Sequence, residues 1–270
     1  MAGQAATLAG GGRLLGFPTS IFRGCKKFEI CYNSDVNHYK NSGDYMNRFA
    51  FTLAEVLITL GIIGVVAALT MPNLIANHKA KQLRTAFLKG YSMLTQAYEQ
   101  YHKDTSCSTT DCLRSGFYMD LKPYFKIAKY CKIDNNLNDK DCFKRETTDT
   151  SYKNFSKTVS GISTYMFDDG QFVTIDGMLV TFEQQATGNK YVFIGLDTNG
   201  HQKGPNVLGQ DLFLFQIVNK GDRGFVLPVG AEGTAYKGDT YCSLTSTNSV
   251  NGYTCAAKAL AEQDFFKKLK

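Results

Sequence analysis

An apolar run over residues 51–75 constrains the fold of this chain more than any other feature of its sequence. It consists mostly of Leu, Ile, Val, Ala and Gly, and Glu55 is the only formally charged residue between Arg48 and Lys79. A helix rises about 1.5 Å per residue, so this run reaches about 37 Å and exceeds the hydrocarbon core of a bilayer. A core helix of a soluble protein would normally show a polar face, which is missing here. We therefore expect a membrane-spanning helix that Pro72 kinks near its end.

The helical pattern continues over residues 76–105 but becomes amphipathic. Large apolar residues recur at spacings of three and four, which marks one face of a helix: Leu83, Phe87, Tyr91, Leu94, Tyr98 and Tyr101. A cleaved secretory signal would be followed by a break in composition rather than by this continuation. We predict one helix over about residues 52–104, which spans the membrane in its first half and packs on a soluble domain in its second.

The start of the apolar run carries a family resemblance. The stretch resembles the class III signal and N-terminal helix of type IV pilins and type II secretion pseudopilins. The residues that match are Phe51, Thr52, Leu53, Glu55, Val56, Leu57, Gly61, Gly64 and Pro72. The likeness covers the long helix, whereas the rest of the chain agrees with the family only in general layout.

The resemblance implies how the chain is processed. A prepilin peptidase would cut between Ala50 and Phe51 on the cytoplasmic side, and the new amine of Phe51 would be methylated. The family usually has Gly before the cut, so Ala50 is a departure from its pattern. The apolar helix would then stay attached as an inner-membrane anchor, with the C-terminal domain outside the cytoplasm, and later form the core of a filament.

Glu55 is costly in an apolar span, since a charge at mid-bilayer costs about 2.5–3.5 kcal/mol on insertion scales. No Lys or Arg lies within the same run. A buried carboxylate without a partner is destabilising, and a pair that forms between subunits would set their register. The partner that we expect is the amine of Phe51 on a neighbouring subunit, and the resemblance implies the same docking role for Glu55.

Residues 1–50 are long for a leader of this family. Met46 precedes Arg48, and a start at Met46 gives a short basic leader that obeys the positive-inside rule. Residues 1–45 show no sustained hydrophobic period. We expect translation to begin at Met46, with residues 1–45 an artefact of the assigned start or a disordered extension.

Six of the eight cysteines lie beyond residue 100, in three local pairs. None forms a CxxC pair and no spaced His pair follows, which argues against zinc. An even number in an extracytoplasmic domain favours disulfides over reduced thiols. Sequence alone leaves the connectivity open, and local pairing would give Cys107–Cys112, Cys131–Cys142 and Cys242–Cys255.

The remaining residues, 106–270, are expected to form an α+β globular head. Short helices are predicted over residues 120–129 and 261–270. Runs of β-branched and aromatic residues separated by short turns predict an antiparallel sheet over residues 162–167, 171–175, 178–184, 190–197, 211–218 and 224–230. We expect the second half of the long helix to cover one face of this sheet, which is the roll that pilin heads share.

One loop of the head suggests metal chemistry. Asp197, Asn199 and Asp211 bring oxygen atoms to a Gly-rich loop whose start resembles a calcium-binding loop. The bidentate Glu of an EF-hand is missing. A turn-rich β-connection built on Asx turns explains the same residues, so no cofactor is expected, with calcium kept as an alternative. Asp168 and Asp169 are expected to shape a hairpin.

The sequence therefore predicts a structural subunit, major or minor, of a type IV pilus, competence or type II secretion filament. Its partners would be other pilin-like subunits, prepilin peptidase and an inner-membrane assembly platform. No catalytic motif is present, and the mixed charges favour a solvated surface over a nucleic-acid interface. The alternative is a single-pass, membrane-anchored extracytoplasmic protein that binds a ligand or calcium and does not polymerise.

Overall fold

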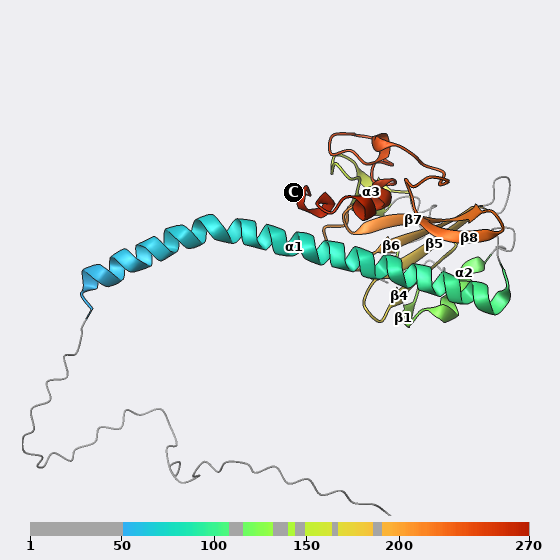
Figure 1. The fold of residues 1–270 in the computed structure, drawn as a ribbon, viewed down its shortest axis with the longest axis horizontal. Helices are drawn as coiled ribbons and strands as arrows, with labels where there is room; N and C mark the ends of the chain where they lie inside the picture. Colours follow the sequence, from blue (N-terminus) through green and yellow to red (C-terminus); the bar gives the residue numbers. More distant parts are fainter. Residues whose placement is uncertain are drawn as a thin grey trace, which may run out of the picture. The chain divides into compact units, whose positions relative to one another are not determined.

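The computed structural model describes residues 51–107, 116–131, 140–143, 149–163, 167–185 and 191–269. The chain divides into two units, Met1–Thr52 and Leu53–Lys270. The second unit combines a long helix with an antiparallel sheet (Figure 1), so the expected α+β class is confirmed. The predictions for the leader, including Met46 and Ala50, lie outside the described residues.

The long helix α1 covers Leu53–Thr105, within one residue of the predicted bounds. It runs through Pro72 without a break, and Figure 1 shows that it changes direction within its blue N-terminal part. The large apolar side chains of its first half are exposed, for example Leu53 at 80% and Leu69 at 73%. By length and composition, α1 can cross a membrane.

The second half of α1 packs on the head through the predicted stripe. Phe87, Leu94, Tyr98 and Tyr101 are buried, while Leu83 and Tyr91 are partly buried against the same core. Gly90 allows the close approach, because a Cβ at this position would collide with the side chain of Leu196. The helical period therefore identified the face that meets the sheet.

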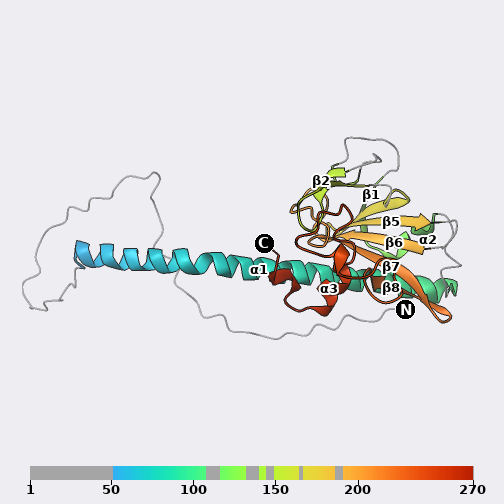
Figure 2. The ribbon, with the colours of Figure 1, turned by 90° about the horizontal axis from the view of Figure 1, so that it is seen from above.

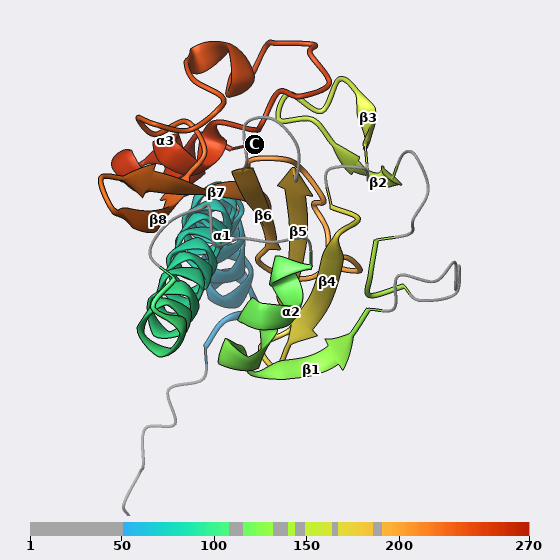
Figure 3. The same cartoon turned by 90° about the vertical axis from the view of Figure 1, so that its right-hand side faces the viewer.

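Six strands of the described residues form one antiparallel sheet in the order β1-β4-β5-β6-β7-β8. Their bounds are Ile127–Tyr130, Gly170–Thr174, Leu179–Gln185, Tyr191–Asp197, Leu212–Lys220 and Arg223–Pro228. Strands β2 (Asp149–Lys153) and β3 (Ser160–Ile162) pair separately. The strands β4 to β8 are joined in sequence order, and in Figure 3 the sheet curves around α1 and the short helix α2 (Phe117–Leu121).

The two faces of the sheet bury different partners. Phe182, Ile194 and Phe215 belong to one core cluster with residues of α1 and α2. Residues on the alternate positions, such as Phe193 and Leu214, pack with Tyr152 under the loops of the opposite face. Because side chains alternate along a strand, burial on both faces explains why these strands read as continuous apolar runs.

Two predicted short helices are wrong. Over residues 120–129, α2 ends at Leu121, a 3₁₀ turn η2 covers Lys122–Tyr124, and β1 follows. Pro123 lacks the N–H that a continuing helix needs, and β1 instead pairs with the edge of β4.

At the C-terminus the helix lies upstream of the prediction. Helix α3 covers Cys255–Ala261, and the described residues after it, 262–269, contain only the 3₁₀ turn η5, Phe265–Lys267. The adjacent rings of Phe265 and Phe266 are both buried, beside Phe155 and Phe213 respectively. A helix that buries one apolar stripe would not bury two adjacent large side chains against different partners, whereas a tight turn can do so.

Candidate functional site

The exposed half of α1 is the first candidate site. Its hydroxyl groups bond within the helix, Thr59 Oγ1 to the Val56 carbonyl at 3.0 Å and Thr70 Oγ1 to the Val66 carbonyl at 2.9 Å. Because each hydroxyl donates its hydrogen bond within its own helix, lipid or a neighbouring helix does not have to supply an acceptor. Apart from Glu55, the exposed first half of α1 therefore offers a mostly apolar surface.

Glu55 lies in the first turn of α1, where the partial positive charge of the helix N-terminus favours a carboxylate. Phe51, two residues ahead of the helix along the chain, is 82% exposed. Ala50, on the other side of the predicted cut, lies outside the described residues. The structure therefore puts the predicted docking carboxylate at the start of the exposed apolar surface.

Two of the three predicted disulfides are present. Cys131 joins Cys142 and Cys242 joins Cys255, with Cα separations of 5.8 Å and 5.0 Å. Cys112 lies outside the described residues, so the pairing of Cys107 stays a prediction. The local spacing was the signal that identified both observed pairs.

The loop between β6 and β7 brings Asp197 and Asp211 together and buries both. Asp197 Oδ1 accepts the main-chain N–H groups of Asn199 at 3.1 Å and Gly200 at 2.9 Å, and Oδ2 accepts the Tyr152 hydroxyl. Burial and the neighbouring Asp211 carboxylate raise the pKa of Asp197.

Asp211 is held in the same way by main-chain donors. Its Oδ2 accepts the Asn206 N–H at 2.7 Å, and its Oδ1 accepts the N–H groups of Val207 at 2.7 Å and Leu212 at 3.1 Å. Main-chain and phenol donors therefore occupy all four carboxylate oxygens of the pair, as in Asx turns. Asn199 donates to the Gly204 carbonyl at 3.0 Å. A calcium ion would have to displace these hydrogen bonds in order to bind the two carboxylates. Calorimetric titration with calcium tests the alternative that this loop is a calcium site.

A second carboxylate cluster lies beside the hairpin of β4 and β5, where two residues just before β4 meet one residue of β5. Ligand oxygens of Asp168, Asp169 and Glu183 lie within 4.8 Å of one another. Burial, followed by repulsion from the two aspartates, raises the pKa of Glu183 to about 7. Asp169 accepts the Gln184 N–H at 2.5 Å, which is the hairpin-shaping role expected of it. The sequence did not reveal the third member, because Glu183 joins the cluster only through folding.

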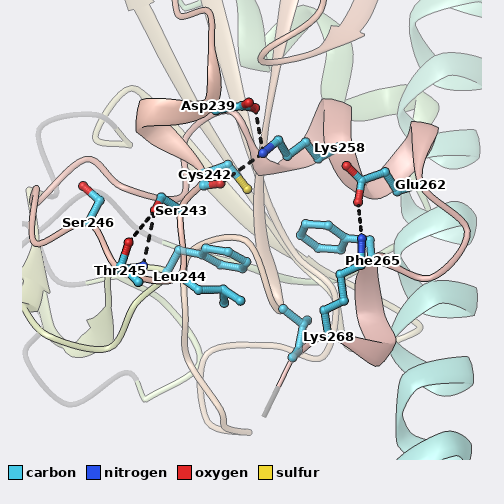
Figure 4. Close-up of a pocket in the computed structure, with 12 residues that line it drawn as sticks. Asp239, Cys242, Ser243, Leu244, Thr245, Ser246, Lys258, Glu262, Phe265 and Lys268 are labelled. Atoms are coloured by element: carbon cyan, nitrogen blue, oxygen red, sulfur yellow. Dashed lines mark hydrogen bonds and ion pairs between the residues drawn. The ribbon is translucent and has the colours of Figure 1, made fainter.

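A groove of about 700 Å³ lies in the head beside the Cys242–Cys255 disulfide (Figure 4). Its apolar wall includes Phe155, Leu244 and Phe265. The sequence gave no signal for this groove, because its walls come from separate segments.

Charged groups at the rim of this groove are ion-paired. Lys258 Nζ lies 2.6 Å from Asp239, and Lys268 Nζ lies 2.9 Å from Glu262. The loop that forms one lip is held by Asn251, which donates to the Ser243 carbonyl at 2.8 Å. The groove therefore combines an apolar wall with a fixed lip, which suits an apolar group better than a free charge.

Comparison with models of known protein families, with curated proteins and with solved structures finds no match.

Proposed function

We propose that the chain is a structural subunit of a type IV pilus-like or type II secretion filament, anchored in a membrane by the first half of α1 before it assembles. The head would lie outside the cytoplasm and take the roll layout of pilin heads. The proposal includes cleavage before Phe51 by a prepilin peptidase and methylation of the new amine. Nothing in this assignment requires catalysis by the chain itself.

One observation supports this function most directly: a single uninterrupted helix has an exposed apolar half and a half buried against the head. An exposed apolar surface of this extent needs lipid or other apolar helices to cover it. Lipid would cover this surface while the chain is in the bilayer, and identical helices would cover it in a filament core.

Two glycines on the exposed half suit close packing between helices. A Cβ at Gly61 or at Gly64 would meet nothing within 4 Å in the isolated chain. Small residues let helix backbones approach closely where no water drives association. A neighbouring helix could therefore contact α1 at these positions, and an ion pair between Glu55 and the amine of Phe51 on that neighbour would set the register.

Expression with and without a prepilin peptidase tests this function. The expected product is a chain that begins with methylated Phe51 and keeps the whole of α1, seen by intact mass and N-terminal sequencing. A product that has lost the apolar helix would identify a cleaved secretory signal instead. An unprocessed chain in the presence of an active peptidase would contradict the proposal.

The groove beside the Cys242–Cys255 disulfide favours a second candidate, a membrane-anchored protein that binds an apolar ligand and does not polymerise. Its volume of about 700 Å³ is in the range of small-molecule sites. Such a protein would need the anchor but not Glu55. The behaviour of a Glu55 variant in assembly therefore separates the two candidates.

A further inference from the structure

We propose that a groove at the base of the head binds the headgroup of an anionic phospholipid. This juxtamembrane groove lies between α1 at residues 76–83 and the C-terminal segment at residues 266–269, with Lys157, Pro205 and Gln210 on its remaining sides. Figures 1 and 2 both show the C-terminal segment beside α1, at the end of the head from which the exposed half of α1 extends. The inference rests on the membrane anchor of the proposed function.

Among the described residues that line the juxtamembrane groove, the charged side chains are all lysines. Three lysines line it, Lys79, Lys157 and Lys267, and no Asp or Glu is among its lining residues. The nearby acids Glu262 and Asp264 pair with Lys268, at 2.9 Å and 3.4 Å. All three lining lysines are exposed. Their ammonium groups therefore surround a ligand that enters the groove, and a positive charge complements a phosphodiester.

The same groove has an apolar wall and amide groups. Leu83, Phe266 and Leu269 line it together with the amide side chains of Asn77 and Gln210. The ring of Phe266 is fixed by its neighbour Phe87, with centroids 5.8 Å apart. An apolar wall beside cations suits a phosphate that is attached to glycerol and acyl chains. A free inorganic anion would gain nothing from this wall.

The position along α1 matches the depth of lipid headgroups. Each headgroup layer is about 5–7 Å thick outside a hydrocarbon core of about 30 Å. Lys79 lies four residues after Ile75, the end of the apolar run, which is about 6 Å along a helix. When the apolar run spans the bilayer with Ile75 at the outer edge of the hydrocarbon core, Lys79 and the juxtamembrane groove thus lie at the level of the phosphates.

The volume of the juxtamembrane groove, about 260 Å³, equals the space of about eight or nine water molecules. This is room for a phosphate and its glycerol but not for the acyl chains, which would remain in the bilayer. Binding would hold the head against the membrane surface before assembly. Each lysine near an anionic surface contributes about 1 kcal/mol, or about fivefold in affinity.

The test uses the full chain purified in a nonionic detergent. The probe is dioctanoyl phosphatidylglycerol, a short-chain anionic lipid, and native mass spectrometry measures the fraction of chain that carries it. The variant Lys79→Gln/Lys157→Gln/Lys267→Gln should bind this lipid about a hundredfold more weakly. A control with the same change of charge, Lys103→Gln/Lys220→Gln/Lys237→Gln, removes exposed lysines elsewhere and should bind as the wild type does.

Two further arms separate the sources of binding. Dioctanoyl phosphatidylcholine should bind far less, and inorganic phosphate at equal concentration should not displace the anionic lipid. A variant with Arg at the three groove positions should retain binding, while all variants should unfold at the wild-type temperature without lipid. Equal binding of both lipids, displacement by inorganic phosphate, or equal loss in the control variant would overturn the inference.

Failure of the inference can be told from failure of the proposed function. A full chain that stays soluble without detergent has no membrane anchor, and that result would overturn both. A chain that requires detergent but binds the two lipids alike would overturn only the lipid site.

Discussion

Replacing Phe87 by Ala should unfold the junction between α1 and the sheet at a lower temperature than any exposed substitution on the same helix. Phe87 is fully buried, and its ring lies 4.6 Å from Phe213, 6.0 Å from Phe215 and 5.8 Å from Phe266, centroid to centroid. Removing a buried Phe ring costs about 3–5 kcal/mol, because transfer energy is lost and a cavity remains. For a domain of this size that corresponds to a decrease in Tm of about 6–20 °C.

The matched control for this prediction is Leu88→Ala. Leu88 is the next residue of α1 but is 37% exposed, so its truncation should cost less than about 1 kcal/mol. Thermal unfolding is followed by the near-ultraviolet circular dichroism of tyrosine, since the chain has no Trp. Equal losses in the two variants, or a change below about 0.5 kcal/mol for Phe87→Ala, would refute the packing of α1 described above.

Three other predictions concern the head. Replacing Cys242 and Cys255 by Ser removes a cross-link between residues 13 apart and should lower the free energy of unfolding by about 3 kcal/mol in denaturant titration; an unchanged midpoint would contradict this. Because folding raises the pKa of Glu183 from 4.5 to about 7, the folded state keeps a proton that the unfolded state loses, so stability should fall between these pH values and level off above them. Glu183→Gln should flatten this pH dependence of Tm, and a steeper profile would argue against it. Gly90→Leu should cost about 1–3 kcal/mol by overpacking against Leu196, whereas a more stable variant would show that α1 does not approach the sheet there.

The long helix and most of the sheet could be predicted because their residues follow simple periods. The stripe that includes Phe87 and Leu94 needed only the helical spacing, and β4 to β8 needed only β-branched and aromatic runs between turns. Strand β1 was mistaken for helix because four residues carry too little pattern to outweigh the preceding turn. Its identity depends on pairing with β4, which the local sequence does not contain.

Among the candidate sites, those formed within a short stretch of sequence could be predicted, whereas those formed by separate segments could not. The two observed disulfides could be predicted because their signals lie within short stretches. The signal for Glu55 is equally local, and its docking role stays a prediction. The juxtamembrane groove was missed because Lys79, Lys157 and Lys267 come from three separate segments that only folding brings together. In the loop of Asp197, the residue types suggested an ion, whereas the structure shows main-chain donors at both carboxylates.

Incorporation of a Glu55→Ala variant into sheared filaments tests the central claim most directly. Thr59→Ala is the control, because the Thr59 hydroxyl bonds only to its own helix among the described contacts. Membrane fractions and filament fractions are compared for both variants in cells that carry the assembly machinery. The account predicts that Glu55→Ala reaches the membrane at the wild-type level but is absent from filaments, while Thr59→Ala enters both. Wild-type incorporation of Glu55→Ala would contradict it and favour an anchor that does not polymerise.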